Sequence, residues 1–396
     1  MAALPTPIRI ARIVTRFGVG GVERHVSTLT ANLNHEKFRS WLICGRAEKN
    51  ERECLEFARD AGVKPIFIDQ MRRNLGPWDI GASLKLGRVL AQIKPQIVET
   101  HQSKAGAIGR SIVRLQFMAK QGRPRLVHTF HGHLFEGHFS SPVAKAFIAI
   151  ERQLAKLTDM IITVTPTLRR QLIEKYRIAR GDKVRVIPLG FDFAWATDLS
   201  RHRGWLRARL GVDDSTVIFG FIGRLTKIKN AQLLLRAFAK MLLNSPMDAR
   251  LVVIGDGELL VELQSLASEL AIGHRVLFCG WVLDRAKIFC DLDVTCLSSY
   301  NEGSPVCLIE SLAVGIPVVA TRVGGVADMV VDGQDGELVE SDNDEAYAVA
   351  LARVANRRSR IPQERSAATR EYYSTSRMVK DIESIYSEVL EGAGAR

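Results

Sequence analysis

The chain has 396 residues, of which 46 % are hydrophobic and 25 % are charged, and this size predicts about two globular domains. No stretch approaches the roughly 18 apolar residues of a membrane-spanning helix, and the first residues lack the basic-then-apolar pattern of a signal peptide. The six cysteines form no C-x-x-C pair, which favours reduced thiols in a cytoplasmic protein over a disulfide framework.

The net charge of +12 is concentrated in the first half of the chain. Residues 1–193 carry 32 Lys and Arg against 16 Asp and Glu, a balance of +16, whereas the remainder is slightly acidic. A basic first half predicts an anionic partner. Because no zinc finger, RNA-recognition signature or base-reading basic helix occurs, we favour an anionic membrane surface or a lipid-linked phosphate over nucleic acid. Solubility alone is the competing explanation. The expected membrane contacts are a few of Arg72, Arg73, Arg110, Arg114, Lys120, Arg123 and Arg125.

Strand-like apolar runs alternate with amphipathic helical segments along the chain, which predicts an α/β fold of parallel sheets with crossover helices. In the first half we expect strands at Ile8–Thr15, Ser40–Cys44, Lys64–Ile68, Ile97–Thr100, Leu126–Thr129, Met160–Val164 and Val184–Pro188. Helices are expected there at Glu23–Leu33, Leu84–Ile93 and Ala144–Leu157. In the second half we expect strands at Val217–Ile222, Arg250–Ile254, Val276–Cys279, Asp293–Leu297 and Pro317–Ala320, and helices at Asn230–Leu243, Leu259–Leu270 and Arg377–Leu390.

Glycines follow the first strand, in the segment Gly18-Val19-Gly20-Gly21, just before the first helix. Glycine at this place lets the backbone approach a phosphate at a helix N-terminus. A dehydrogenase fingerprint needs G-x-G-x-x-G, but Arg24 occupies the last position and no acidic residue ends the next strand. A hydride-transfer enzyme is therefore a poor fit.

Histidines crowd the segment that follows the strand Leu126–Thr129. The cluster consists of His128, His131, His133 and His138, with Glu136 among them. Such a cluster is compatible with a zinc site, but neither H-E-x-x-H nor a cysteine companion occurs. His131 and His133 alternate at the strand end, so both can face a cleft, and we favour contacts with a substrate over a metal site. His101, Ser103 and Lys104 likewise end a strand and open a helix, where simple capping by Ser103 is the alternative.

Two cations follow the strand Val217–Ile222. Arg224 and Lys229 are five residues apart on a strand-to-helix turn, so both can converge on one diphosphate, whereas Lys227 is interpreted as a solvated charge. Asp291-Leu292-Asp293 spells a D-x-D metal motif, but it leads into the buried run Val294–Leu297 and is interpreted as structural.

Two carboxylates, Glu302 and Glu310, are separated by eight positions around an expected helix N-terminus. Ser304 is a suitable N-cap and Pro305 a suitable first helical residue, and Gly315-Ile316-Pro317 ends the helix. Both carboxylates can bind sugar hydroxyls, and the free N–H groups between them can face a phosphate.

In this order, the segments resemble the family 4 retaining glycosyltransferases, which have two Rossmann-like lobes around a cleft, the GT-B fold. The resemblance is carried by Gly20-Gly21-Val22-Glu23, His101–Gly106, Thr129–His133, Phe221–Leu225 with Lys229, Val253–Gly257, the E-x7-E segment Glu302–Glu310, and Gly324–Asp328. The glycine that usually follows the lysine is Asn230 here. The family's G-x-D turn, matched by Gly190-Phe191-Asp192, implies a first lobe over 1–193, a nucleotide-sugar lobe over 194–372, and a final helix in 373–396 that packs back on the first lobe.

The resemblance also implies roles. The diphosphate would be held by Arg224 and Lys229, and the ribose by Glu310. The donor sugar would be held by Glu302 and by the backbone of Gly303, Ser304, Pro305 and Val306. Gly20 and Gly21 would close on the phosphates. His131 would lie near the donor sugar, with His101, Ser103, Lys104 and His133 on the acceptor side. Neither cofactor nor metal is required. The expected activity is hexosyl or N-acetylhexosaminyl transfer from a nucleotide-sugar donor to a glycan or lipid-linked acceptor. The acceptor would belong to surface-polysaccharide or lipopolysaccharide assembly. A UDP-sugar is the favoured donor, and guanosine and adenosine donors stay open.

Two other classes of enzyme use similar residues. A glycoside hydrolase also needs two carboxylates, but no diphosphate cations. A sugar-nucleotide epimerase of the same architecture would act on the donor alone, and product analysis separates it from a transferase.

Overall fold

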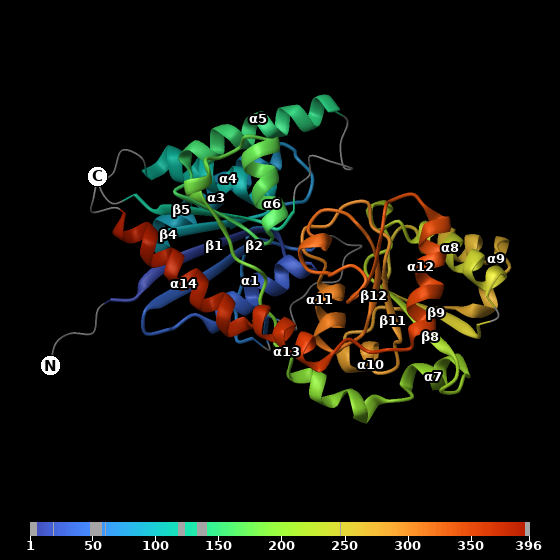
Figure 1. Cartoon of the computed structure of the whole chain (residues 1–396). Coiled ribbons are helices and arrows are strands. Elements are labelled where there is room, and N and C mark those ends of the chain that lie inside the picture. The colour runs from blue at the N-terminus through green and yellow to red at the C-terminus, as the bar shows by residue number, and fades with distance from the viewer. Residues whose placement is uncertain are drawn as a thin grey trace. The chain divides into compact units, whose positions relative to one another are not determined.

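The computed structural model describes residues 6–18, 20–47, 58–59, 61–117, 123–132, 141–245 and 247–392. The chain divides into two compact units (Figure 1), namely Met1–Phe191 with Tyr373–Arg396, and Asp192–Tyr372. It leaves the first unit at Phe191 and returns at Tyr373, where the Phe191 N–H donates to the Tyr373 carbonyl at 2.8 Å. These positions lie close to the boundaries after residues 193 and 372 that the resemblance implies.

The first unit contains a seven-stranded sheet in the order β3-β2-β1-β4-β5-β6-β7, and its recorded strand pairs are parallel. Its strands are β1 Ile8–Arg16, β2 Phe38–Gly45, β3 Ile66–Phe67, β4 Ile97–His101, β5 Arg125–Phe130, β6 Met160–Thr163 and β7 Val184–Val186. Its α-helices, within the described ranges, are α1 Gly21–Asn32, α3 Trp78–Ile93, α4 Ser103–Phe117, α5 Ser141–Leu157, α6 Pro166–Arg170 and α14 Thr375–Glu391. Parallel order places the carboxyl ends of these strands on one edge of the sheet.

Helix α14 belongs to the first unit although it ends the chain. Its apolar face, with Met378 and Ile382, packs against Ile10 and Ile97 in one core cluster. Its Tyr386 hydroxyl donates to Glu99 Oε2 at 2.6 Å and accepts from Arg12 Nη2 at 2.8 Å. A buried hydroxyl with two partners fixes the position of the helix more closely than apolar contact alone.

The second unit contains a six-stranded sheet in the order β10-β9-β8-β11-β12-β13, again with parallel pairs. Its strands are β8 Val217–Ile222, β9 Ala249–Ile254, β10 Val276–Gly280, β11 Val294–Leu297, β12 Val318–Thr321 and β13 Gly336–Val339. Its α-helices, where the structure describes the chain, are α7 Trp205–Leu210, α8 Ala231–Asn244, α9 Leu260–Glu269, α10 Arg285–Phe289, α11 Val306–Ala313, α12 Asp344–Arg357 and α13 Gln363–Tyr372.

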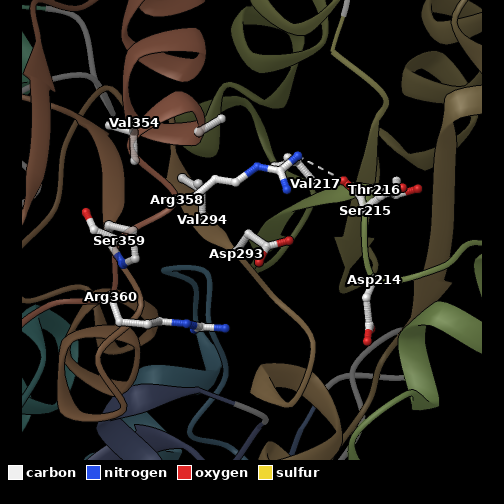
Figure 2. A pocket seen from close by; sticks show the side chains of 12 residues that line it. Asp214, Ser215, Thr216, Val217, Asp293, Val294, Val354, Arg358, Ser359 and Arg360 are labelled. Atoms are coloured by element: carbon white, nitrogen blue, oxygen red, sulfur yellow. Dashed lines mark hydrogen bonds between the residues drawn. The ribbon is translucent and has the colours of Figure 1, made fainter.

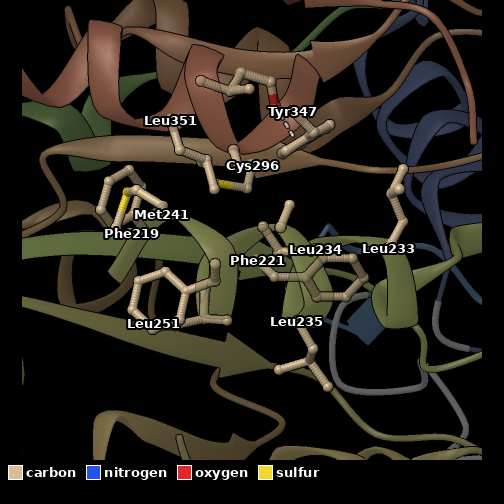
Figure 3. Close-up of a cluster of buried hydrophobic side chains, with 14 of the residues drawn as sticks. Phe219, Phe221, Leu233, Leu234, Leu235, Met241, Leu251, Cys296, Tyr347 and Leu351 are labelled. Carbon is tan, nitrogen blue, oxygen red and sulfur yellow. Dashed lines mark hydrogen bonds between the residues drawn. The ribbon is translucent and has the colours of Figure 1, made fainter. Parts of the chain in front are cut away.

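One face of this second sheet packs against α8 and α12. Figure 3 shows Phe219 and Phe221 of β8 among Leu234, Met241 and Leu351 of the two helices. Tyr347 is fully buried there because its hydroxyl donates to the Val319 carbonyl at 2.7 Å. The rigid layer beneath β8 and β11 supports the turns that leave their carboxyl ends.

Two differences from the sequence-based expectation concern the second unit. Strand β13 is not among the expected strands, because the short segment Gly336–Val339 follows a run of turn-forming residues, and helices α7, α12 and α13 are additional to the expected helices. Helix α11 begins at Val306, with Pro305 in the N-cap position at φ −69° and ψ 111°. Ser304 is therefore not the N-cap, and Pro305 is not the first helical residue. The extended ψ of Pro305 moves the helix start one residue along the chain.

Candidate functional site

The turns at the carboxyl edge of the second sheet pack closely because glycines remove side chains between them. Gly255 follows β9 with φ +136°, and a Cβ there would lie 1.9 Å from the Gly223 carbonyl oxygen. Gly324 follows β12 with φ +49°, and a Cβ there would lie 1.9 Å from the Glu302 carbonyl oxygen. Both positions therefore require glycine. The two contacts hold the turn before Arg224 and the loop of Glu302 in place.

Lys229 and Glu302 form an ion pair at this edge. Lys229 Nζ lies 2.5 Å from Glu302 Oε1, which also accepts a hydrogen bond from Ser299 Oγ at 2.6 Å. Burial by itself would lower the pKa of Lys229, but the Glu302 carboxylate outweighs it, and the pKa of the ammonium group is raised. Lys229 is therefore a fixed positive charge at neutral pH.

Arg224 is exposed and makes no ion pair with any residue that the structure describes. Its charge acts on Lys229, because repulsion between the two cations opposes the rise in the pKa of the ammonium group. Two neighbouring cations, of which only Lys229 is paired with a carboxylate, leave a net positive charge. This arrangement suits an anion such as a diphosphate.

Asn230 explains the departure from the glycine that usually follows the lysine. Its backbone is left-handed, with φ 46° and ψ 46°, between the turn Lys227–Lys229 and helix α8. Asparagine tolerates this conformation better than any other residue except glycine. The substitution therefore keeps the turn that positions Lys229.

Helix α11 carries the second carboxylate of the E-x7-E segment. Glu310 is 5 % exposed, and its Oε1 lies 2.7 Å from Nε of Arg285, at the start of α10. The two atoms form an ion pair without a directed hydrogen bond between them. Sequence reasoning missed Arg285, since a single arginine 25 positions away in a short helix carries no motif. The Asp284 N-cap, which accepts from the Lys287 N–H at 3.3 Å, was the available signal for that helix.

The N-terminus of α11 also offers backbone donors. The first N–H groups of a helix have no intrahelical acceptor, and in α11 these begin at Val306, while Gly303 and Ser304 precede the N-cap in the adjoining loop. Pro305 has no N–H, so it shapes the turn without donating. Ser304 Oγ is buried and has no hydrogen-bond partner among the described residues.

The D-x-D segment has structural partners in the second unit. Asp291 accepts from the N–H groups of Gly204 at 2.7 Å and Leu206 at 2.8 Å, and Asp293 accepts from that of Ile218 at 2.8 Å. These carboxylates hold the chain before β8 and β11, at the amino edge of the sheet.

A cavity of about 210 Å³ lies at the same amino edge (Figure 2). It is lined by residues that include Asp214, Asp293, Val294, Arg358 and Arg360. Arg224, Lys229 and Glu302 all follow the opposite ends of β8 and β11. Because ligands of parallel sheets bind outside the carboxyl ends of the strands, the cavity is a poor candidate for the reaction site.

The first unit also places its candidate residues at the carboxyl edge of its sheet. Gly20 is the N-cap of α1 with an extended backbone, at φ −171° and ψ 167°, and Gly21 is the first helical residue. A Cβ at Gly20 would lie 2.4 Å from Glu23 Oε2. Gln102 accepts from the Thr15 N–H at 3.1 Å, which connects the ends of β1 and β4.

Three histidines from separate elements meet at this edge: His25 in α1, His101 at the end of β4 and His131 after β5. His101 Nδ1 lies 3.0 Å from His131 Nε2, and the His25 ring stands edge-on to both, with centroids 5.7 and 4.9 Å away. Burial lowers the pKa of His25 to about 3 and holds that of His131 well below its usual value. The His25 and His131 rings are therefore neutral imidazoles at neutral pH.

The histidines expected in one cluster after β5 therefore occupy different places. His128 lies apart from this cluster, buried and 2.8 Å from Thr100 Oγ1, whereas sequence reasoning missed His25. His25 is one helical turn after Gly21, on the helix face that is buried, which was its available signal. His133, His138 and Glu136 lie outside the described residues.

The remaining acceptor-side candidates open α4. Ser103 is the first residue of that helix and is half-buried. Lys104 Nζ lies 2.6 Å from Asp79 Oδ1 and 2.5 Å from the Asn74 carbonyl. The ammonium group therefore connects α4 to the start of α3, and Lys104 already has a structural role.

Comparisons with known proteins define the class. Residues 19–195 match the family described as Glycosyltransferase Family 4, and residues 205–372 match the family described as Glycosyl transferases group 1. The chain therefore belongs to the family 4 glycosyltransferases, and it is a glycosyltransferase.

Individual relatives span most of the chain. An Escherichia coli protein named UDP-Gal:alpha-D-GlcNAc-diphosphoundecaprenol alpha-1,3-galactosyltransferase is 29 % identical over 363 residues, covering 90 % of each chain. A D-inositol 3-phosphate glycosyltransferase of Acidothermus cellulolyticus is 30 % identical over 312 residues, covering 74 % of this chain and 67 % of its own. Anabaena HepE, solved with UDP and glucose, superposes with a TM-score of 0.79 at 18 % identity, covering 96 % of this chain and 100 % of its own. The last likeness confirms the GT-B fold class.

Proposed function

We propose that this glycosyltransferase is a retaining enzyme that uses a UDP-sugar. It transfers a hexosyl or N-acetylhexosaminyl unit to a glycan or lipid-linked acceptor in surface-polysaccharide or lipopolysaccharide assembly. The observation that carries the proposal is the charge arrangement of Arg224, Lys229 and Glu302 at the carboxyl edge of the second sheet. The galactosyltransferase named above, which is similar over 90 % of the chain, supports the choice of donor and acceptor.

The proposed leaving group is the nucleotide diphosphate. When the bond between the anomeric carbon and the phosphate oxygen breaks, negative charge develops on that phosphate. Arg224 and Lys229 stabilise this charge as fixed cations, and they therefore act more strongly on the transition state than on the ground state. Because Glu302 shares Lys229, the diphosphate enters as a second anionic partner of the same ammonium group. No step of this account needs a metal or a cofactor.

The donor sugar and the ribose have separate partners in the proposal. Glu302 accepts hydrogen bonds from sugar hydroxyls, and the N–H groups at the start of α11 face the phosphates. Glu310, held by Arg285, accepts from the ribose hydroxyls. In the first unit, Gly20 and Gly21 approach phosphate, His131 contacts the donor sugar, and His101, Ser103, Lys104 and His133 serve the acceptor.

Retention follows from attack on the face that the diphosphate leaves. The acceptor oxygen bonds to the anomeric carbon while the carbon–phosphate-oxygen bond breaks, and the acceptor proton passes to the departing phosphate oxygen. This balance of bonds requires no protein nucleophile.

We propose membrane attachment through the first unit as part of the function, and the side chains on one helical layer support it. The helical layer of α3, α4 and α5 and the loop before it expose Leu75 (70 %), Ile80 (70 %), Leu115 (81 %) and Ile150 (51 %). Arg72, Arg73, Arg114 and Lys145 are exposed on the same segments. Apolar side chains among cations suit an anionic lipid surface. Among the described residues, no helix is long and apolar enough to cross a membrane.

The expected set of membrane-facing arginines needs correction. Arg110 is fully buried, and its Nη2 lies 2.8 Å from Glu151 Oε2, so it cannot reach a lipid surface. Arg123 and Arg125 pair with Asp159 at 2.8 and 3.2 Å. Lys120 lies outside the described residues.

Product analysis tests the proposed reaction. The purified chain is incubated with UDP-galactose, UDP-glucose or UDP-N-acetylglucosamine and a lipid-diphosphate-linked sugar. We expect release of UDP together with an acceptor longer by one sugar, joined with the anomeric configuration of the donor. An inverted linkage contradicts retention, and an epimerised donor without acceptor extension contradicts transfer.

A further inference from the structure

We propose that His25, His101 and His131 form a binding site for a divalent transition-metal ion such as Zn²⁺, and that a bound ion withdraws His131 from the substrate. The consequence for the substrate rests on the proposed function. Each histidine offers one ring nitrogen, and these three nitrogens lie within 4.8 Å of one another. Three imidazoles around one point are a common set for zinc, with a fourth position for water.

His25 supplies an independent reason to expect a ligand. It is 3 % exposed, and both of its ring nitrogens are buried without a hydrogen-bond partner among the described residues. Buried polar atoms are normally paired, because an unpaired one loses its water without compensation. The neighbouring rings of His101 and His131 lie beside it, at centroid distances of 5.7 and 4.9 Å. A metal ion bound between the three rings would give His25 the partner that it lacks.

Glu99 sets up His101 as a ligand. His101 Nε2 lies 3.5 Å from Glu99 Oε1 without a hydrogen bond to it, and the nearby carboxylate favours the ring proton on Nε2 and the lone pair on Nδ1, toward the cluster. Glu99 is held by Arg12 Nε at 2.8 Å and by Thr129 Oγ1 at 3.2 Å. A carboxylate behind a histidine orients the ring and strengthens it as a metal ligand.

Binding requires the three ring nitrogens, which lie within 4.8 Å of one another, to draw closer together, with the least change between His101 and His131. His101 Nδ1 and His131 Nε2 are 3.0 Å apart in a hydrogen bond, whereas ligands at zinc–nitrogen distances of about 2.0–2.1 Å in a tetrahedron stand about 3.3 Å apart. The ion takes the place of the proton that His131 Nε2 donates to His101 Nδ1. That proton moves to Nδ1 of the same ring, so the protein binds the ion without releasing a proton. Imidazole ligands favour Cu²⁺, Zn²⁺, Ni²⁺ and Co²⁺ over Mg²⁺ and Ca²⁺.

Metal titration of the untagged, metal-free full chain tests the site without relying on activity. Calorimetry with Zn²⁺ and visible absorption with Co²⁺ are compared for the wild type, His25→Gln, His131→Gln and His35→Gln. His35 is an exposed histidine just beyond α1 and serves as the matched control. We expect one ion per chain with tetrahedral Co²⁺ bands, at least tenfold weaker binding in the first two variants, and no change in His35→Gln.

Several results would overturn the site. They are absence of stoichiometric binding to the wild type, equal affinity in His25→Gln and the wild type, or octahedral Co²⁺ bands. His131 is half-buried, so His131→Gln keeps the test decisive if His25→Gln does not fold, which its thermal unfolding curve reveals.

Inhibition distinguishes this inference from the proposed function. With an active transferase, Zn²⁺ should lower turnover of the wild type reversibly, and at least tenfold more Zn²⁺ should be needed for His25→Gln. Zinc binding that depends on the histidines but leaves turnover unchanged would support the metal site and contradict the role of His131 at the substrate.

Discussion

Lys229 donates to Glu302 across 2.5 Å, so a cation assigned to the diphosphate and a carboxylate assigned to the sugar are partners of each other before any substrate binds. Ser299 Oγ donates to the same carboxylate oxygen at 2.6 Å. The pair keeps Lys229 charged and keeps Glu302 oriented in a partly buried turn. Removing either side chain alone leaves the charge of the other without its partner.

We expect Arg224→Ala and Lys229→Ala to lower kcat roughly ten- to a thousandfold each, because both meet charge that grows in the transition state. Turnover at saturating donor is the measurement. Lys227→Ala is the matched control, since Lys227 is exposed on the same turn. A change confined to KM would show that the two cations bind the donor without assisting departure.

Lys229→Ala should weaken donor binding more than Arg224→Ala does, because it also leaves Glu302 as an unpaired carboxylate facing the phosphates. The double variant Lys229→Ala/Glu302→Gln should therefore recover part of the UDP affinity lost in Lys229→Ala. Calorimetry with UDP measures this coupling, which for contacting charges amounts to about 0.5–3 kcal/mol. Strict additivity would contradict the shared use of the ammonium group.

Glu310→Ala is expected to weaken UDP binding, since the ribose loses a charged acceptor worth about 1.5–3 kcal/mol. Arg285→Ala should act differently, because it leaves a carboxylate that is 5 % exposed without its 2.7 Å partner. That change should also lower the free energy of unfolding, by about 1–3 kcal/mol. Denaturant unfolding and UDP calorimetry separate the two effects. Unchanged affinity in a folded Glu310→Ala protein contradicts the ribose assignment.

Turnover should survive treatment with EDTA, because Arg224 and Lys229 supply the positive charge at the leaving group. An assay with and without the chelator decides this. Loss of activity that one added divalent ion restores would mean that a metal takes part in the reaction.

Tyr386→Phe should lower the free energy of unfolding by about 1–3 kcal/mol, because Arg12 and Glu99 are fully buried and lose a shared partner. Ser387→Ala, which removes an exposed hydroxyl from the same helix, should stay within about 0.5 kcal/mol. Chemical denaturation compares them. Equal stability of both variants would mean that apolar packing alone holds α14.

Vesicle co-sedimentation should show binding to anionic but not neutral lipid, weakening as salt rises, since exposed charges are screened within about 8 Å at physiological ionic strength. Leu115→Asp should reduce this binding, whereas Leu243→Asp, at an exposed leucine of the second unit, should not. Binding that ignores lipid charge, or that both variants retain, contradicts attachment through the α3–α5 layer.

The sequence by itself determined most of the strands and their parallel arrangement, because apolar runs of strand length between helical periods have few other solutions in an α/β fold. It also determined the family, since residues such as Gly324 record local backbone requirements that few residue types satisfy. The edge strand β13 was not predicted from the sequence, because it is stabilised by pairing with β12 and has no strand-like pattern of its own.

Only the tertiary structure decided which side chains meet. Arg285 reaches Glu310, Lys104 reaches Asp79, and His25 joins His101 and His131, in each case from elements far apart in the chain. These contacts depend on the position of each helix against its sheet, and that position is determined by the packing of the whole core. No single residue type or spacing records them, so periodicity predicts the elements while packing decides the partners of each charge.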